Sequence, residues 1–312
     1  MPPKLTMSAS DWLLLIFLST LWGGAFFLVE IAVPEIPPLT LALSRCGFAA
    51  VLLVIYVYAS GLSLPSNLRT WAALLPLAAM NTVLPFSLIF WGQTHITSSL
   101  ASILNASAPL FSIVLAHLAT TDDRMTLPRA AGVAIGFTGV VVMIGVDALR
   151  DIGIDVLAQL AVVLAAFLYA SAGVYGRRFK ALPSSVVAAS VLTIGTVLLI
   201  PVAGYAERPW ELPMPSVPAI AAMLVLSLLS TGLAFLIYFR VLGRAGAVNF
   251  QLVAFLIPVS AILLGVGLLG ERLEPRHIAG MAAIAIGLAA IDGRPWRFLK
   301  GLFGGAPKEA ER

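Results

Sequence analysis

A few polar side chains in this sequence interrupt long apolar runs, and they are the first candidates for chemistry. Asn81 and Asn105 each stand in such a run. An amide can donate to a carboxylate and accept from an ammonium, so the pair could hold a small zwitterion. If both runs are helices, Asn81 shares one broad face with Leu88, Gly92 and His95. Asn105 shares a face of small and polar side chains with Ala101, Ala108 and Ser112. The alternative is a hydrogen bond between helices, worth about 0.6 kcal/mol on average in a membrane.

Two aromatic residues occupy similar positions in two other apolar runs. Trp22 and Tyr169 each lie near the middle of a run, away from the ends where aromatic residues usually anchor a membrane helix. Flat rings can stack on a ligand ring or hold an ammonium by cation–π attraction. We therefore predict that both rings contact a bound molecule, with packing in the protein core as the alternative.

Three ionisable side chains could bind or gate. His95 is expected at the outer end of a helix, where it could bind substrate, gate or titrate, or be an ordinary interfacial histidine. Arg45 is expected about 10 Å into a helix at the usual rise per residue, and Glu30 at a similar depth in another helix. We predict a structural or gating ion pair between Glu30 and Arg45, with capture of a substrate carboxylate by Arg45 as the alternative.

Prolines and glycines within the apolar runs suggest hinges and close helix contacts. Pro85, Pro109 and Pro258 each free a backbone carbonyl inside a helix, so they are either hinges or static kinks. Glycines recur in two runs, and we interpret these stripes as tight helix packing: Gly132, Gly136 and Gly139 in one, Gly280 and Gly287 in the other.

Other chemistries lack their residues. No apolar run has two acids at its centre, and the three histidines are scattered, so an intramembrane enzyme has no catalytic pair and no zinc motif. The one cysteine, Cys46, cannot form an intramolecular disulfide. Rings of charge or a filter loop, as in channels, are not evident. We expect neither a metal nor a cofactor.

The composition places these residues in a membrane. Hydrophobic residues make up 60% of the 312 positions and charged residues 11%, with a mean hydropathy of +1.00, whereas soluble domains carry about 25% charged residues. Runs of about 20 apolar residues match the thickness of a bilayer as helices. The sequence thus predicts an all-α polytopic membrane protein with ten transmembrane helices, at about 11–33, 38–59, 69–93, 97–120, 128–146, 154–176, 184–206, 216–240, 246–269 and 275–292.

The basic residues predict the orientation. With the N-terminus in the cytoplasm, cytoplasmic segments hold 14 of the 19 Lys and Arg residues and outer loops hold 4. We expect both termini in the cytoplasm of a bacterium, around a multi-pass inner-membrane protein, with residues 293–312 as a basic cytoplasmic tail. The net charge of +4 follows this topology, so it does not indicate nucleic-acid binding.

The sequence also repeats. Phe90, Pro109 and Asp122 fall 149 positions before Phe239, Pro258 and Glu271. After a one-residue gap the glycine stripes coincide, and Trp22 meets Tyr169. The chain is thus two five-helix repeats, 11–146 and 154–292. Because five is odd, the second repeat must insert upside down, an arrangement that places a substrate site near the membrane midplane.

These features together resemble a known family. The paired central aromatics, the proline in each fourth helix, the acid after it and the glycine-rich fifth helix are similar to the drug/metabolite transporter superfamily, EamA type. The Asn105–Pro109 spacing and the polar Thr94–His95 resemble the bacterial exporters of aromatic amino acids. One departure is clear. Small multidrug members carry a glutamate at the middle of their first helix, whereas here Glu30 lies near the outer end.

The resulting hypothesis is a monomeric carrier in the lipid bilayer that exports small metabolites. The neutral, aromatic and amide-bearing site favours aromatic or other neutral amino acids, moved by alternating access as a uniporter. The direction of export is implied mainly by the resemblance. The alternatives are a proton-coupled exporter of drugs or organic cations, a transporter of another small metabolite and, remotely, an intramembrane enzyme.

Overall fold

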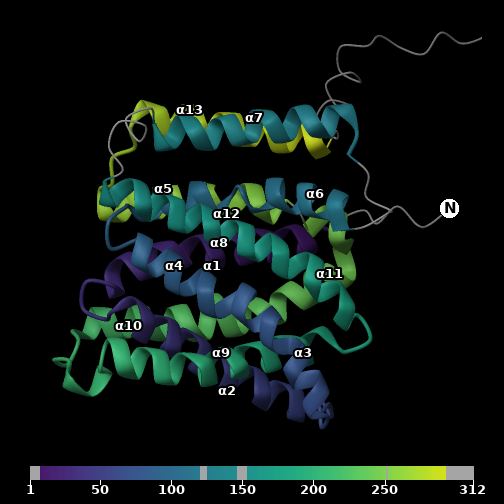
Figure 1. The fold of residues 1–312 in the computed structure, drawn as a ribbon, viewed down its shortest axis with the longest axis vertical. Coiled ribbons are helices and arrows are strands. Elements are labelled where there is room, and N and C mark those ends of the chain that lie inside the picture. The colour runs from purple at the N-terminus through teal and green to yellow at the C-terminus, as the bar shows by residue number, and fades with distance from the viewer. Residues whose placement is uncertain (1–7, 120–124, 146–152, 251, 293–312) are drawn as a thin grey trace, which may run out of the picture.

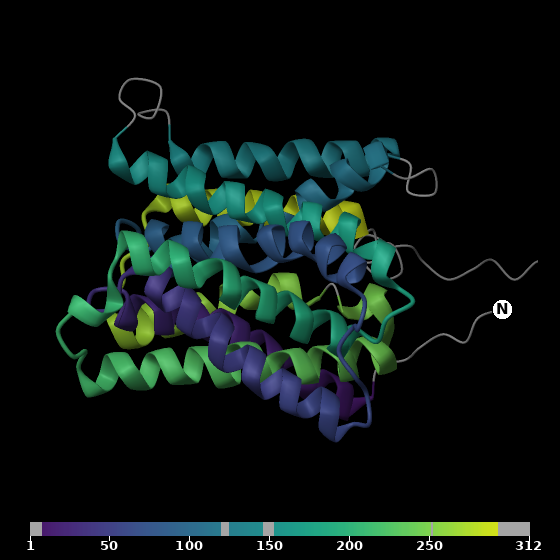
Figure 2. The same cartoon turned by 60° about the horizontal axis from the view of Figure 1, so that its bottom comes forward.

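The computed structural model describes residues 8–119, 125–145, 153–250 and 252–292, and they form a bundle of helices (Figure 1). Eight spans within these residues are long and apolar enough to cross a bilayer, and two shorter apolar helices, Val253–Leu269 and Pro275–Ile291, bring the number to ten. Figure 2 shows that the axes of the helices of both halves are roughly aligned. The predicted all-α polytopic class is confirmed.

The first half contains five spans. These are α1 (Ala9–Ala32), α2 (Pro38–Ala59), the composite α3 (Leu68–Ala78), η1 (Ala79–Val83) and α4 (Leu84–Gly92), the broken span α5 (Ser98–Asn105) and α6 (Ala108–Ala119), and α7 (Leu127–Ile144).

The second half repeats this order. It contains α8 (Ile154–Gly176) with the 3-10 turn η3 (Arg177–Phe179), α9 (Ser184–Ala206), the 3-10 turn η4 (Pro209–Glu211), the composite α10 (Val217–Ser227), η5 (Leu228–Leu233) and α11 (Ala234–Phe250), then α12 (Val253–Leu269) and α13 (Pro275–Asp292).

The two halves pack on each other through reciprocal pairs of spans. The second spans, α2 and α9, pack on each other, and so do the fifth spans, α7 and α13 (Figure 1). The first span of one half packs on the fourth span of the other: α1 lies against α12, and α8 lies against α5 and α6. These reciprocal pairings are those expected of inverted repeats.

Glycines make the contact between α7 and α13 possible. A Cβ added at Gly132 would lie 2.6 Å from the carbonyl oxygen of Gly287, and one added at Gly139 would lie 2.6 Å from that of Gly280. Neither position can accept a side chain, so the backbones of the two fifth spans touch at two symmetry-related points. The stripes are tight packing surfaces, as predicted.

The largest departure from the predicted helices is at the junction of the eighth and ninth spans. A turn was expected between residues 240 and 246, but α11 continues to Phe250. Arg244 falls within the predicted turn. In the structure it lies on α11, and its Nε is 3.2 Å from the carboxylate of Asp11 on α1, so the longer helix pairs this charge with a partner.

Candidate functional site

One end of the bundle is held closed by three glutamates, each bonded to the first residues of a helix in the other half. Glu207, after α9, accepts from Leu39 N at 2.9 Å, Thr40 N at 2.7 Å and Thr40 Oγ1 at 2.7 Å. Because α2 begins at Pro38, this carboxylate caps a helix N-terminus, where the unpaired N–H groups and the helix dipole favour negative charge.

The second glutamate, Glu271, caps α5. It accepts from Ser98 N at 2.9 Å, Ser98 Oγ at 2.7 Å and Ser99 N at 3.0 Å, and from Ser99 Oγ in a further short bond. The residue belongs to the second half and α5 to the first. Four donors converge on one carboxylate, which makes this the most extensive of the three contacts.

The third glutamate, Glu35, reaches in the opposite direction, from the first half to the second. It accepts from Ser216 N and Ser216 Oγ, both at 2.6 Å, immediately before α10. Glu35 lies in the turn after α1, and these hydrogen bonds lower the pKa of its carboxyl from the ordinary value. We call the three contacts the clamps, and this end, on the left of Figure 1, the clamped end.

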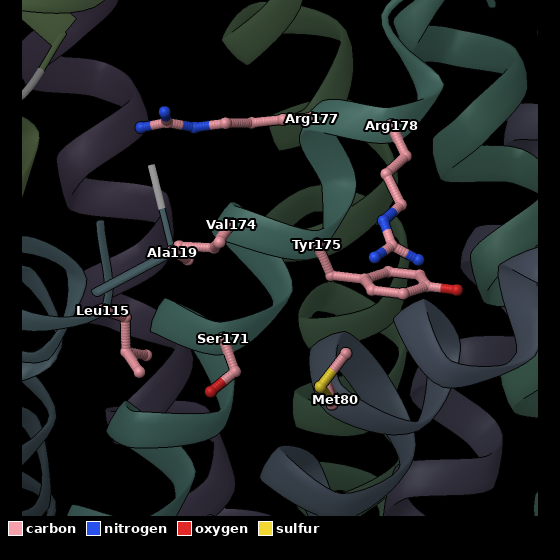
Figure 3. Close-up of a pocket in the computed structure, with 8 residues that line it drawn as sticks. All are labelled: Met80, Leu115, Ala119, Ser171, Val174, Tyr175, Arg177 and Arg178. Carbon is pink, nitrogen blue, oxygen red and sulfur yellow. The ribbon is translucent and has the colours of Figure 1, made fainter. Parts of the chain in front are cut away.

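Two hollows lie at the opposite end. The first, of about 460 Å³, is shown in Figure 3 and is lined by Met80, Leu115, Ala119, Ser171, Val174, Tyr175, Arg177 and Arg178. The second, of about 370 Å³, lies between the segment 61–66 after α2 and Leu182, Pro183 and Val186. Both are lined by residues of the two halves. Carboxylate caps thus join the halves at one end. At the other end two hollows lie between them, beside direct contacts that include the ion pair of Arg244 with Asp11 and the hydrogen bond that Tyr175 Oη donates to the carbonyl oxygen of Ala73 at 3.0 Å.

Two arginines stand at the first hollow. The guanidinium of Arg178 lies over the ring of Tyr175, 4.7 Å from its centroid. Figure 3 shows Arg178 folded back on this ring, while Arg177 extends away from it. Both follow the end of α8, so the hollow has a positively charged rim.

Between the two ends, the third span of each half contains a π-helical turn, η1 or η5. Thr82 lies in the first and Thr231 in the second, 149 residues apart. Each turn is followed by two stacked phenylalanines, Phe86 with Phe90 and Phe235 with Phe239, with ring centroids 6.0 Å apart in each pair. Pro85 follows only η1, so proline alone does not cause these turns. Because π turns in helices are rare and frequent at functional sites, their repetition marks the middle of both spans.

Arg45 on α2 lies against the second π turn. Its Nε donates to Thr231 Oγ1 at 2.8 Å, and its guanidinium carbon lies 4.0 Å from the centroid of Phe86. The phenol of Tyr169 is close enough to interact electrostatically with this charge. Tyr169 is therefore placed beside a cation in the middle of the bundle.

The predicted ion pair between Glu30 and Arg45 is not formed in this structure. Glu30 instead accepts from Gln93 Nε2 at 3.3 Å, and the same nitrogen donates to the carbonyl oxygen of Phe26 at 2.9 Å. Depth along a helix is similar for Glu30 and Arg45, but their side chains have different partners. Glu30 belongs to the clamped end, whereas Arg45 faces η5.

The other predicted site residues are dispersed. Trp22 packs against Tyr238, with ring centroids 6.0 Å apart, in a different cluster from that of Tyr169. His95 is exposed at the clamped end, where its Nδ1 lies 2.7 Å from Thr94 Oγ1. Asn81 is half-buried in η1, next to Met80 of the first hollow. None of the predicted substrate-binding side chains lines either hollow.

Asn105 ends α5, and its side-chain Oδ1 is buried without a hydrogen-bond partner among the described residues. The span breaks after this residue because Pro109 cannot donate to the carbonyl of Asn105 and its ring clashes with that group. Pro258 lies in α12, which is not interrupted. The carbonyl four residues before this proline lies in the first turn of the helix. Thus one proline sits at a break and the other does not.

The glutamate clamps were not predicted as site residues. Glu271 was noticed only as a repeat marker, and the clamp partners are 167 to 181 residues apart in the chain. A partial signal exists in the Ser98-Ser99 and Pro38–Thr40 helix starts, which supply backbone and hydroxyl donors. Among the described residues no cluster of three His, Cys, Asp or Glu side chains is placed to hold a metal ion.

Comparisons with known proteins agree with this architecture. A family model described as "EamA-like transporter family" matches twice, at residues 10–145 and 156–291. A "probable terminal-alkyne amino-acid exporter" of Streptantibioticus cattleyicolor is 28% identical over 92% of this chain and 95% of its own. The "uncharacterized inner membrane transporter YedA" of Escherichia coli (strain K12) is 26% identical, with 87% of each chain covered.

A similar relative and a solved structure extend the comparison. An "uncharacterized transporter" of Archaeoglobus fulgidus is 26% identical over 85% of this chain and 91% of its own. One crystal structure superposes with a TM-score of 0.65 at 19% identity, over 91% of this chain and 98% of the other. At that identity the likeness concerns the fold alone.

Proposed function

Because the chain belongs to the EamA-like transporter family, we propose that it is a multi-pass membrane carrier that exports small neutral or aromatic amino acids by alternating access. The transporter class and the membrane location come from the family and the relatives, which point away from an enzyme. The substrate, the direction and the mechanism are the proposal.

The difference between the two ends is the observation that carries the mechanism. Three clamps join the halves at one end, whereas at the other end two hollows lie between them, beside the ion pair of Arg244 with Asp11 and the hydrogen bond of Tyr175 with Ala73. In an alternating-access carrier the two halves rock about a central site, so one end is closed while the other is open. The positive charges of the loops support a cytoplasmic location for the hollow end. In this proposal the structure is the inward-open state, and the clamps are the closed outer gate.

Several features support an amino acid as the substrate. The Streptantibioticus relative carries an amino-acid exporter's name. The enclosed Oδ1 of Asn105 is an unused acceptor, which a substrate ammonium would reach only when α5 moves. Asn81 would add a second amide, Trp22 and Tyr169 would offer aromatic faces along the path, and His95 would meet the substrate at the outer gate.

The moving parts follow from the breaks in the spans. Pro109 lies at the break between α5 and α6, about one helix length along the chain from the residues that Glu271 caps. This geometry favours Pro109 most as a hinge. Pro85 follows η1 directly, whereas Pro258 lies in an unbroken helix. We propose that release of the clamp at Ser98 and Ser99 lets α5 tilt about this break.

Counterflow in proteoliposomes tests the function. Liposomes loaded with unlabelled phenylalanine, tryptophan or threonine should accumulate the labelled amino acid transiently and saturably. Trp22→Ala and Tyr169→Ala should reduce this flux while the proteins remain folded and inserted. If the wild-type protein exchanges none of the panel, the proposed substrate class is wrong. Unchanged flux in both variants would remove these rings from the path.

Transport can be uncoupled, as a uniport, or coupled to the movement of protons. The scarcity of carboxylates inside the spans favours uniport, in which flux leaves the internal pH unchanged. The second version is proton coupling, favoured by one observation: Glu30 is a half-buried carboxylate within α1 that accepts from Gln93. A pH-sensitive dye inside the liposomes separates them. Substrate-driven proton movement that is lost in Glu30→Gln would replace uniport with proton coupling.

A further inference from the structure

We propose that Arg45 and the π-helical turn η5 form a binding site for the carboxylate group of the transported molecule. The inference rests on the proposed function, because it assigns a part of the substrate to a part of the carrier. In this inference Arg45 pairs with the carboxylate of the substrate and not with Glu30.

Most of the hydrogen-bonding capacity of Arg45 is unused. A guanidinium has five N–H donors, and only Nε has a hydrogen bond within the described part of the chain, to Thr231 Oγ1. The terminal nitrogens are not among the fully enclosed unpaired atoms, and the residue is half-buried. These donors are therefore unpaired without being sealed in, although neither hollow is lined by Arg45, so a substrate would reach them as the halves move. A planar pair of such donors matches a carboxylate in two parallel hydrogen bonds.

The charge of Arg45 is also not neutralised. No carboxylate of the described residues lies within ion-pair distance of it, and the nearest acid predicted from depth, Glu30, is occupied by Gln93. A cation inside a membrane span is costly, and such residues usually pair or face a cavity. An arriving carboxylate would supply the counter-charge.

The surroundings hold the guanidinium in one orientation. Phe86 contacts it from 4.0 Å, and Phe90 lies 5.7 Å away. Thr231 is fixed in turn, because its hydroxyl donates to the carbonyl oxygen of Leu226 at 3.0 Å and so presents a lone pair to Nε. That carbonyl is five residues back, at the spacing of a π turn. The turn η5 thus positions Thr231, and Thr231 positions Arg45.

The equivalent location in the other half shows that the scaffold does not require this cation. The helix α9 that corresponds to α2 contains no Lys, Arg, Asp or Glu. Its neighbour Thr82 donates to Ala78 O at 2.8 Å, as Thr231 does to its own helix, and no arginine lies over Phe235 or Phe239 in the described structure. The π turn with its threonine and two stacked phenylalanines therefore forms without a neighbouring charge. Arg45 is not needed to build it.

Two pairs of compounds test the assignment. Phenylalanine and phenylalaninamide differ only in replacement of the carboxylate, as do benzoate and benzamide. With wild-type protein, the carboxylates should inhibit counterflow at least about tenfold more strongly than the amides, the size expected for charge-assisted hydrogen bonds. In Arg45→Gln this preference should disappear through weaker binding of the carboxylates, with the amides unaffected. Arg69→Gln, which removes an exposed arginine at the start of α3, is the matched control for charge and should keep the preference.

The variants are compared only after their folding is checked by size exclusion and thermal melting in detergent. A folded Arg45→Gln protein that keeps the carboxylate preference would overturn the inference. Should Arg45→Gln not fold, Arg45→Lys keeps the charge but loses the planar fork, and it should bind the carboxylates several-fold more weakly. An unchanged preference in that variant would equally overturn the inference.

Failure of the proposed function would give a different result. If wild-type protein shows no counterflow with any amino acid, the function is wrong, and the carboxylate site is then judged by binding alone. Benzoate should raise the melting temperature of the wild-type protein and not that of Arg45→Gln, while benzamide should affect neither. Equal stabilisation by benzoate and benzamide would reject the site independently of transport.

Discussion

The two halves of this protein share the same backbone features and differ in where their charged residues lie. Each third span has a π turn with a threonine followed by two stacked phenylalanines. The first half alone adds an arginine, Arg45, inside its second span. At the clamped end the second half supplies two glutamates, Glu207 and Glu271, and the first half supplies one, Glu35.

This difference separates two kinds of requirement. Features that recur in both halves, such as glycine contacts and π turns, serve the packing and movement of an inverted repeat. In the proposed mechanism, features present in one half serve steps that are not symmetric: closing one end of the bundle, and holding a substrate whose own two ends differ in charge. The following substitutions break the shared features or exchange the asymmetric ones.

The largest effect is expected at the shared glycine contact. Gly132→Leu and Gly280→Leu should each prevent assembly of α7 with α13, because an added Cβ meets a backbone carbonyl or Met143 at once. Overpacking costs about 1–3 kcal/mol or more, so both variants should melt several degrees lower or fail to fold. Gly173→Leu on α8 is the control, since a Cβ there meets nothing within 4 Å. A difference in melting temperature between the two glycine variants would show that the two halves do not contribute equally to this contact.

The clamps should contribute unequally to closure. A reporter cysteine at the buried Ile36, in a Cys46→Ala background, should become reactive to an impermeant thiol reagent from outside as clamps are removed. Glu271→Gln should have the greatest effect, then Glu207→Gln, then Glu35→Gln, in the order of the donors that each carboxylate loses. Glu211→Gln, at the same end but paired only within its own loop, should leave the reactivity unchanged. A uniform response to all four changes would contradict the assignment of the clamps.

The two threonines of the π turns provide a sharper comparison. Thr231→Val removes the acceptor of Arg45 Nε and should weaken carboxylate inhibition by about fivefold to tenfold. This is less than the loss of a hydrogen bond to a charged group, because Thr231 only orients the arginine. Thr82→Val removes the same hydroxyl from the other turn, which has no arginine partner, and should leave the carboxylate preference intact. The ratio of inhibition constants for phenylalanine and phenylalaninamide is the measurement. Equal losses in both variants would indicate a general role in helix packing.

The smallest effect concerns pH at the Glu35 clamp. Hydrogen bonds from Ser216 lower the pKa of Glu35 below its ordinary value of about 4.5. A lowered pKa means that the clamp is at full strength above pH 4.5 and weakens as the pH falls through the lowered value. The thiolate is the reactive form of cysteine, so each rate is divided by that of a fully exposed cysteine at the same pH. This normalised reporter reactivity in the wild-type background should rise slightly at pH 4 and below relative to pH 7. The same rise in Glu35→Gln would show that another group titrates.

Much of this architecture could be predicted from the sequence. Apolar length and charge placement predict the spans, and the glycine stripes predict the contact of α7 with α13, because these features depend on local composition. The boundary after α11 was wrong because Arg244 reads as a loop residue until Asp11 is seen beside it. The partner of Arg45 was also missed, since depth along a helix says nothing about the direction in which a side chain points. The clamps join residues more than 160 positions apart, a distance over which one sequence carries no pairing signal.

The central claim is that the clamped end must open for transport. It is tested by joining Glu35→Cys to Ser216→Cys with a short bifunctional thiol reagent across the two halves; the buried Cys46 does not compete for the reagent. Crosslinking Arg208→Cys to Glu211→Cys, within one loop of the same end, is the control. The account predicts that the first crosslink stops counterflow, that cleaving it restores the rate, and that the control crosslink has no effect. Counterflow at an undiminished rate in the protein crosslinked across its halves would contradict it.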